Sequence, residues 1–171
     1  YQLAENNGAS YFSSAPSIIN IINALGATKF ARVITDRKPD VIICTHVFAA
    51  QMVDELKKRV PNLPPVRINT NGHANLILGR DVCPELKGRI DTVSISLNAI
   101  TAQEYVALCH PVQGEAAYQA MLDFARESKQ YVPHVILTIV DKDKTPEEIQ
   151  TCKDIARDLG VKLRIRSFID S

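Results

Sequence analysis

The strongest constraint on the fold is a regular alternation between short apolar runs rich in β-branched residues and longer segments with helical periodicity. Strands are predicted over residues 40–46, 66–70, 91–98, 134–141 and 162–170. Helices are predicted over residues 17–35, 49–60, 101–108, 114–129 and 146–159. A strand followed by a helix and then by another strand pairs in parallel, because the helix returns the chain to the same end of the sheet. The pattern therefore predicts an α/β protein.

Two layouts of that sheet are compatible with the pattern. We predict a single α/β domain over residues 1–171, with a five-stranded, mainly parallel sheet and helices on both faces, a Rossmann-like three-layer arrangement. The alternative is an open partial βα barrel, in which the strands run in sequential order instead of reversing at a switch point. Five strands are too few to close a barrel without a partner, and this favours the open sheet.

Local signals are strongest for the helix over residues 146–159. Thr145 precedes it as an N-cap, Pro146 occupies its first turn, Glu148 completes a capping box and Gly160 follows its end. Residues 74–88 are expected to form a loop with a short helical turn at 82–86.

Composition excludes several classes of partner. The 171 residues include 20 Lys and Arg against 19 Asp and Glu, so a net charge of +1 gives no reason to expect nucleic acid. No apolar run approaches the ~18 residues of a membrane span, and no signal sequence is apparent. We therefore expect a soluble cytoplasmic protein without a transmembrane segment or membrane-surface contact, monomeric or homodimeric.

The cysteines do not suggest a metal site. Cys44, Cys83, Cys109 and Cys152 have no C-x-x-C spacing, and reduced thiols are expected. Cys44 and His46 share a strand face, but together with Cys83 they are too few for a closed site. We predict no metal ion.

Polar residues at the strand ends form the candidate site, because ligands of parallel sheets bind where the strands end. These residues are Thr70, Asn71, Ser94, Ser96 and Asn98. Ser94, Ser96 and Asn98 alternate with apolar residues and are expected on one face, although a strand partly facing water has the same pattern. Thr70 and Asn71 are also explained by a strand-ending turn at Gly72.

Two arginines on the last predicted strand also share a face. Arg164 and Arg166 alternate with Leu163 and Ile165. Facing inward, the arginines would bind a carboxylate or phosphate, and facing outward they would protect an edge strand. The edge position is favoured.

Residues 11–64 resemble the N-terminal domain of the monogalactosyldiacylglycerol synthase and diacylglycerol glucosyltransferase family. The resemblance rests on residues 38–46 (KPDVIICTH), with an amphipathic helix before them and a second helix after them. It implies an acceptor domain of an enzyme that transfers sugar from a UDP-sugar to diacylglycerol at a membrane surface. The sequence lacks the sugar-nucleotide domain of that family and has Val47 where the family favours proline.

Residues 65–170 are similar to the later βα units of radical SAM barrels, most closely the TatD-associated group. The similarity rests on residues 66–73 (VRINTNGH), 91–99 (DTVSISLNA), 131–141 (YVPHVILTIVD) and 160–166 (GVKLRIR). It implies that Thr70, Asn71, Ser94, Ser96 and Asn98 contact S-adenosylmethionine. The three-cysteine loop that binds the iron–sulfur cluster is not in the sequence, so no cluster is expected.

The two family fragments meet near residues 63–66, and each lacks its catalytic half. This predicts a recombined or engineered chimeric scaffold without catalytic activity. No catalytic residue and no obligatory cofactor are predicted. The alternatives are a residual module that binds S-adenosylmethionine or another nucleotide, and an acceptor-domain fragment of a glycolipid glycosyltransferase.

Overall fold

The structure, a computed structural model, describes residues 16–45 and 49–168. The chain divides into two compact units: residues 1–39 with 51–63, and residues 40–50 with 64–171. The chain passes between the units three times, after Pro39, Ala50 and Leu63. Whether the two units form one folded domain stays a prediction.

The first unit contains helix α3 (Pro16–Arg37) and most of helix α4 (Ala49–Arg59). Ala27 and Ile34 of α3 and Val53 of α4 are buried. The predicted helix includes Gly26. A Cβ atom at this position would lie 3.2 Å from the Met52 Cε of α4. The small residue therefore permits close approach of α4.

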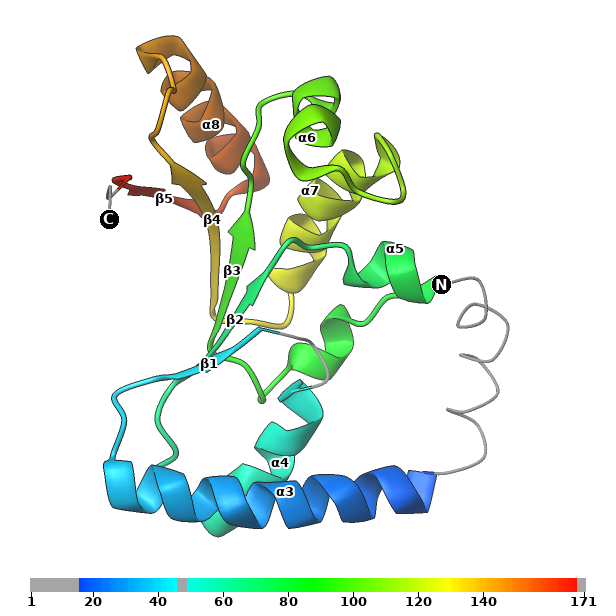
Figure 1. The fold of residues 1–171 in the computed structure, drawn as a ribbon, viewed down its shortest axis with the longest axis vertical. Coiled ribbons are helices and arrows are strands. Elements are labelled where there is room, and N and C mark those ends of the chain that lie inside the picture. Colours follow the sequence, from blue (N-terminus) through cyan, green and yellow to red (C-terminus); the bar gives the residue numbers. More distant parts are fainter. Residues whose placement is uncertain (1–15, 46–48, 169–171) are drawn as a thin grey trace. The chain divides into compact units, whose positions relative to one another are not determined.

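The second unit is a five-stranded parallel sheet (Figure 1). Its strands are β1 (Ile42–Cys44), β2 (Val66–Thr70), β3 (Thr92–Ser96), β4 (His134–Val140) and β5 (Lys162–Arg166). The predicted α/β class and the five-stranded parallel sheet are confirmed. The order is β1-β2-β3-β4-β5, without a switch point, which is the order expected for an open partial βα barrel.

The connections between these strands contain short and long helices. They are α5 (Ala74–Leu78), the 3₁₀ turn η1 (Cys83–Leu86), α6 (Ala102–Cys109), α7 (Ala116–Ser128) and α8 (Pro146–Leu159). In Figure 1, α5, α6 and α7 lie on the same side of β2 and β3. Met121 and Phe124 of α7 are buried, as are Val93 and Ile95 of β3 and the apolar residues Val135, Leu137 and Ile139 of β4. These side chains form the core of the second unit.

Gly72 shows how closely α7 approaches the end of β2. Its φ is +81°, and a Cβ atom there would lie 3.2 Å from the Met121 Cα and 3.3 Å from the Ile95 Cγ2. A side chain would strain the backbone and collide with a helix backbone atom. The Asn-Gly pair therefore has a structural role in the turn, as one of the two sequence interpretations proposed.

Most local predictions are confirmed, with three differences. The capping box at Thr145 and Glu148 forms, and Gly160 ends α8 with φ +64°. The predicted strands over 40–46 and 162–170 are shorter, since β1 and β5 are the edges of the sheet and pair on one side only. Helix α5 was expected to be loop, because its five residues are too few to show a helical period.

Candidate functional site

One face of the sheet in the second unit carries most of its polar side chains, with the apolar Ile43, Ile136 and Val140 among them. We define the polar sheet face by these residues: Arg67, Asn69, Ser94, Ser96, Thr138, Arg164 and Arg166. The register places them together, since Ser96 pairs with Thr138 and Thr138 pairs with Arg164. The opposite face is apolar, with buried Val93, Ile95 and Leu137. Parallel strands that are covered on both faces are normally apolar on both. Arg164 and Arg166 on this face are exposed, so its polar side chains can contact either solvent or a ligand.

Arg67 donates two hydrogen bonds to neighbouring side chains on this face. Its Nη2 donates to Ser94 Oγ at 2.7 Å, and its Nε donates to Asn69 Oδ1 at 3.0 Å. Partial burial lowers the pKa of Arg67, and the positive charges of Arg164 and Arg166 lower that pKa further. Three guanidinium groups on one face are therefore close enough to repel one another.

The two arginines of β5 lie where the edge-strand interpretation of their sequence pattern places them, and their role in binding an anion stays a prediction. Arg164 and Arg166 are exposed and belong to an edge strand. Their register partners on β4 are Thr138 and Val140, which places both on the polar sheet face. They therefore sit where an anion on that face would meet them.

The structure brings two of the five predicted site residues together on the polar sheet face. Ser94 and Ser96 share it, and Ser94 is buried with 5% of its surface exposed. Thr70 belongs to the other face, because its register partner is Ile95. Its Oγ1 accepts a hydrogen bond from Gly72 N at 3.1 Å, and Asn71 Oδ1 accepts from His73 N at 3.4 Å.

The fifth predicted residue, Asn98, lies just beyond β3. Its φ is +58°, a left-handed conformation that asparagine tolerates better than most residues. Its Nδ2 donates to Cys109 Sγ at 3.5 Å. Asn98 therefore joins the end of β3 to the end of α6.

A buried polar pair lies near the same end of the sheet. His73 is 4% exposed and Tyr105 is 1% exposed, and the Tyr105 hydroxyl lies 3.0 Å from His73 Nε2. Burial lowers the pKa of His73 and raises the pKa of Tyr105 to about 12. Both groups are therefore neutral at pH 7, and one hydrogen bond joins the hydroxyl to the imidazole nitrogen, with the donor set by the His73 tautomer.

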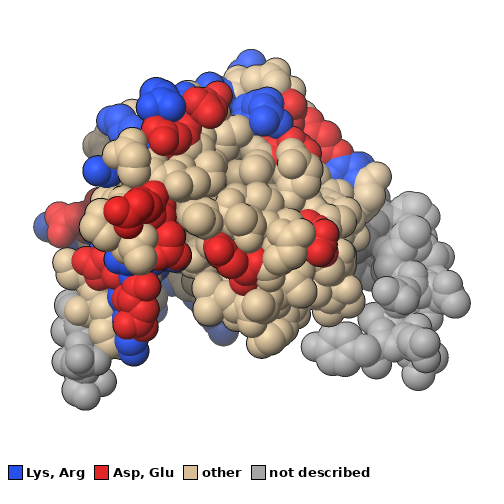
Figure 2. Space-filling model, turned by 90° about the horizontal axis from the view of Figure 1, so that it is seen from above, with Lys and Arg blue, Asp and Glu red and all other residues tan. Residues whose placement is uncertain are grey.

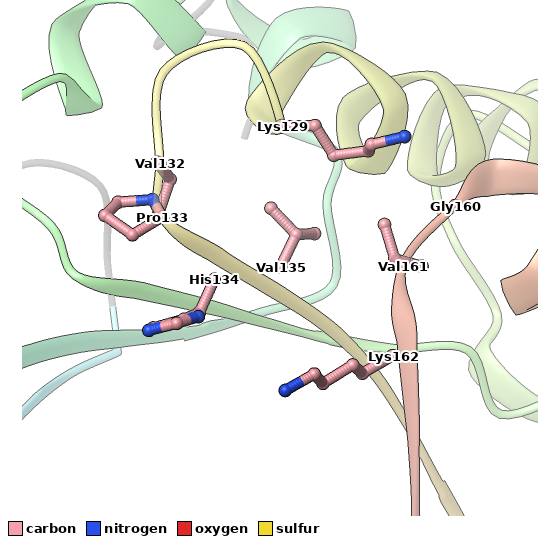
Figure 3. A pocket seen from close by; sticks show the side chains of 8 residues that line it. All are labelled: Lys129, Val132, Pro133, His134, Val135, Gly160, Val161 and Lys162. Carbon is pink, nitrogen blue, oxygen red and sulfur yellow. The ribbon is translucent and has the colours of Figure 1, made fainter.

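A pocket of about 350 Å³ lies at the other end of the sheet, where β4 and β5 begin (Figure 3). Lys129 reaches toward Gly160, and its Nζ donates to the Leu159 carbonyl at 2.7 Å, which caps the end of α8. In Figure 3, His134 and Lys162 point away from Lys129, on the far side of β4. This pocket is at the amino ends of the strands, where ligands of parallel sheets do not usually bind.

No metal site is seen in the part of the chain that the structure describes. Within it, no group of three or more His, Cys, Asp and Glu side chains is arranged to hold an ion. Burial raises the pKa of the Cys44 thiol, and burial raises that of Cys83 to about 11. Both thiols are therefore protonated at pH 7. His46, the other residue considered with them, lies outside the described residues.

The surface around the carboxyl ends of the strands is mixed in charge. Figure 2, seen from above Figure 1, shows Lys and Arg interspersed with Asp and Glu around a broad uncharged area. Exposed Leu108 and Val112 belong to α6 and the loop after it. Within residues 16–45 and 49–168, no helix has the length and hydrophobicity needed to cross a membrane.

Comparison with known proteins bears on the first part of the chain only. The family model described as monogalactosyldiacylglycerol (MGDG) synthase matches residues 1–71. No curated protein matches the chain. The match supports a glycosyltransferase-like N-terminal segment, and it includes β1 and β2 of the sheet. The similarity of the later strands to radical SAM barrels stays an expectation.

Sequence reasoning missed three residues of the polar sheet face, Arg67, Asn69 and Thr138. The signal for the first two was present, because they alternate with Val66 and Ile68. The rule that ligands bind at the ends of parallel strands favours Thr70 and Asn71 instead. Thr138 is the only polar residue between the ends of an otherwise apolar run, and its place on the face depends on pairing that the sequence does not show.

Proposed function

We propose that the second unit is a small-molecule-binding module, with the polar sheet face as its binding surface and no catalytic turnover of its own. One observation carries the proposal: the sheet is apolar on one face, whereas the other face combines buried Ser94 and Thr138 with three arginines. The two buried hydroxyls are already paired, since Thr138 Oγ1 donates to the Ile95 carbonyl at 3.2 Å and Ser94 Oγ accepts from Arg67. Arg164 and Arg166 are exposed, so a ligand would bind mainly through the guanidinium groups.

S-adenosylmethionine or another adenine nucleotide is the ligand class that the radical SAM resemblance suggests. The donor set suits it, since hydroxyls and a guanidinium can hydrogen-bond a ribose or a carboxylate. Ser94, Ser96 and Asn98 are the predicted contacts, with Arg67 beside them. The proposal concerns binding, because the sequence has no three-cysteine motif for the cluster that starts radical chemistry.

Isothermal titration of the full chain with S-adenosylmethionine, and in parallel with ADP, tests this function. We expect saturable binding of at least one of them, with a loss of about tenfold in affinity for Ser96→Ala and Asn98→Ala. Thr101→Ala is the control, because Thr101 caps α6 and is outside the face. If neither ligand binds detectably to a chain that circular dichroism shows to be folded, the binding module is refuted.

A second candidate, an acceptor-domain fragment of a glycolipid glycosyltransferase, is supported by the family match over residues 1–71. Exposed Leu25, Phe30 and Val33 on α3 suit a lipid surface. Flotation with vesicles of phosphatidylcholine and diacylglycerol tests it. The expected result is co-flotation that Phe30→Ser reduces and Phe168→Ser does not. A protein that stays at the bottom of the gradient counts against this function.

We also propose, from the two sequence resemblances alone, that the chain is a recombined or engineered chimera joined near residues 63–66, although the family match extends past this point to residue 71. A chimera of this kind would lack turnover in both parent reactions. Galactose transfer from UDP-galactose to diacylglycerol, measured above background, contradicts it. We further propose that the protein is cytoplasmic and monomeric or homodimeric, which fractionation and light scattering test.

A further inference from the structure

The three arginines of the polar sheet face form a concentration of positive charge in a chain whose net charge is only +1. Lys162 and His134 lie on the same face at its amino end, by the same alternation. The side chains that β1 to β5 direct to this face include no Asp or Glu. The face is therefore a local excess of cations.

Two carboxylates directly adjoin the strands, and each accepts a hydrogen bond from a backbone amide; Asp91 Oδ2 accepts from Val66 N at 2.7 Å. Asp141 directly follows β4, and its Oδ1 accepts a hydrogen bond from Phe168 N at 2.9 Å. Lys142 lies 4.0 Å from the centre of the Phe168 ring and adds another cation beside it. An anionic ligand would relieve the repulsion that Arg164 and Arg166 exert on Arg67.

Arg67 is held in place before any ligand binds. Its bonds to Ser94 Oγ and Asn69 Oδ1 use two of the five N–H donors of the guanidinium and fix its plane. A guanidinium that is already oriented loses less entropy when it binds a phosphate oxygen. Arg164 and Arg166 approach from the other side of the face, on β5.

The separation of these groups indicates the size of the anion. Neighbouring strands lie about 4.8 Å apart, so β2 and β5 are roughly 14 Å apart at the backbone. Arg67 extends from β2 toward Ser94 on β3, and two linked phosphates span the remaining distance to β5 better than a single carboxylate. S-adenosylmethionine fits the charge poorly, because its sulfonium and ammonium groups are positive and only its carboxylate is negative. A phosphate monoester alone carries about −1.5 to −2 at pH 7, and a diphosphate carries more.

We propose that the polar sheet face binds a diphosphate group through Arg67, Arg164 and Arg166, so that the ligand of the second unit is a nucleoside diphosphate. This inference rests on the proposed binding function and specifies its ligand. A nucleic acid is the weaker candidate, because β1 to β5 direct no Phe, Tyr or Trp ring to this face on which successive bases could stack, and His134 lies at its amino end, away from Arg166.

The test is isothermal titration of the full chain with ADP, AMP, inorganic pyrophosphate and S-adenosylmethionine at low salt. We expect ADP and pyrophosphate to bind more tightly than AMP, and their affinity to fall as salt increases. The double variant Arg164→Gln/Arg166→Gln removes two charges from exposed positions, so the fold is retained. It should lose about tenfold or more in ADP affinity.

The matched control is Arg126→Gln/Arg157→Gln, which removes the same charge from exposed positions on α7 and α8. It should change ADP affinity by less than about twofold. Binding of S-adenosylmethionine without binding of ADP or pyrophosphate overturns the diphosphate site and leaves the binding module standing. Silence with all four ligands overturns both. A single-stranded oligonucleotide that displaces ADP and depends on the same two arginines would assign the face to nucleic acid instead.

Discussion

The two faces of the sheet in the second unit come from the same strands and obey different physical rules. The apolar face contacts α7 and buries Val93, Ile95 and Leu137 completely. The polar sheet face alternates with it residue by residue and carries three arginines. The first face stabilises the fold through close packing, whereas the second retains groups that contribute little to stability. We therefore expect substitutions on the two faces to change the free energy of unfolding in opposite directions.

The largest expected effect is in the core against the apolar face. Phe124 of α7 is 1% exposed, and Phe124→Ala should lower the free energy of unfolding by about 3–5 kcal/mol, because it removes buried apolar area and leaves a cavity. Urea denaturation followed by circular dichroism measures this. Phe168→Ala is the control: the ring is 45% exposed, and the loss should stay under about 1 kcal/mol. Equal losses would contradict the assignment of the core.

The next effect tests how closely α7 approaches the sheet. Gly72→Ala should cost about 2 kcal/mol or more, since it combines left-handed strain with a contact to the Met121 backbone. Gly79→Ala has the same left-handed φ but nothing within 4 Å of the new Cβ atom, and should cost about 1 kcal/mol. The difference between the two variants isolates the steric part. A cost for Gly79→Ala as large as that for Gly72→Ala would remove the evidence for close packing.

A smaller effect is expected at the N-terminus of α8. Thr145→Ala removes the hydroxyl that accepts from Glu148 N and should cost about 1 kcal/mol. Thr151→Ala, within the same helix, should be neutral or slightly stabilising, because the Thr151 hydroxyl bonds only the Glu147 carbonyl and alanine favours the helix. Thermal unfolding of both variants makes the comparison. Equal destabilisation would mean that the capping box is not formed in solution.

His73 is a buried polar residue that is paired with Tyr105, and the pH dependence of stability tests whether it is neutral in the fold. Burial lowers the pKa of His73 in the fold, so the unfolded chain binds a proton first as the pH falls. Stability is therefore full above the unfolded pKa of about 6.5, and at most about 0.7 kcal/mol is lost between pH 7 and pH 6. Replacing His73 with glutamine should flatten this slope, because the group whose pKa is lowered by burial is then absent. An unchanged slope in His73→Gln would show that another group titrates.

The sequence predicted the sheet better than it predicted the site. Strands β2 and β4 and helix α8 follow from hydrophobic period and capping residues, which are local signals. The polar sheet face depends on register, and a single sequence does not show that Thr138 pairs with Ser96 and Arg164. Arg164 and Arg166 were therefore assigned to edge protection, although the same two residues also face the site.

The smallest effect has the opposite sign and separates the two faces most clearly. Arg164→Gln/Arg166→Gln removes cations that repel Arg67, so at low salt the free energy of unfolding should stay the same or rise by a few tenths of a kcal/mol. Arg157→Gln breaks an exposed ion pair with Asp154, so the free energy of unfolding of this variant should stay the same or fall slightly. Added salt should cancel the gain in the double variant, because it screens the repulsion already present in the parent chain. A clear loss of stability in the double variant would mean that these arginines hold the sheet edge together, and the case for a ligand on this face would lose its electrostatic basis.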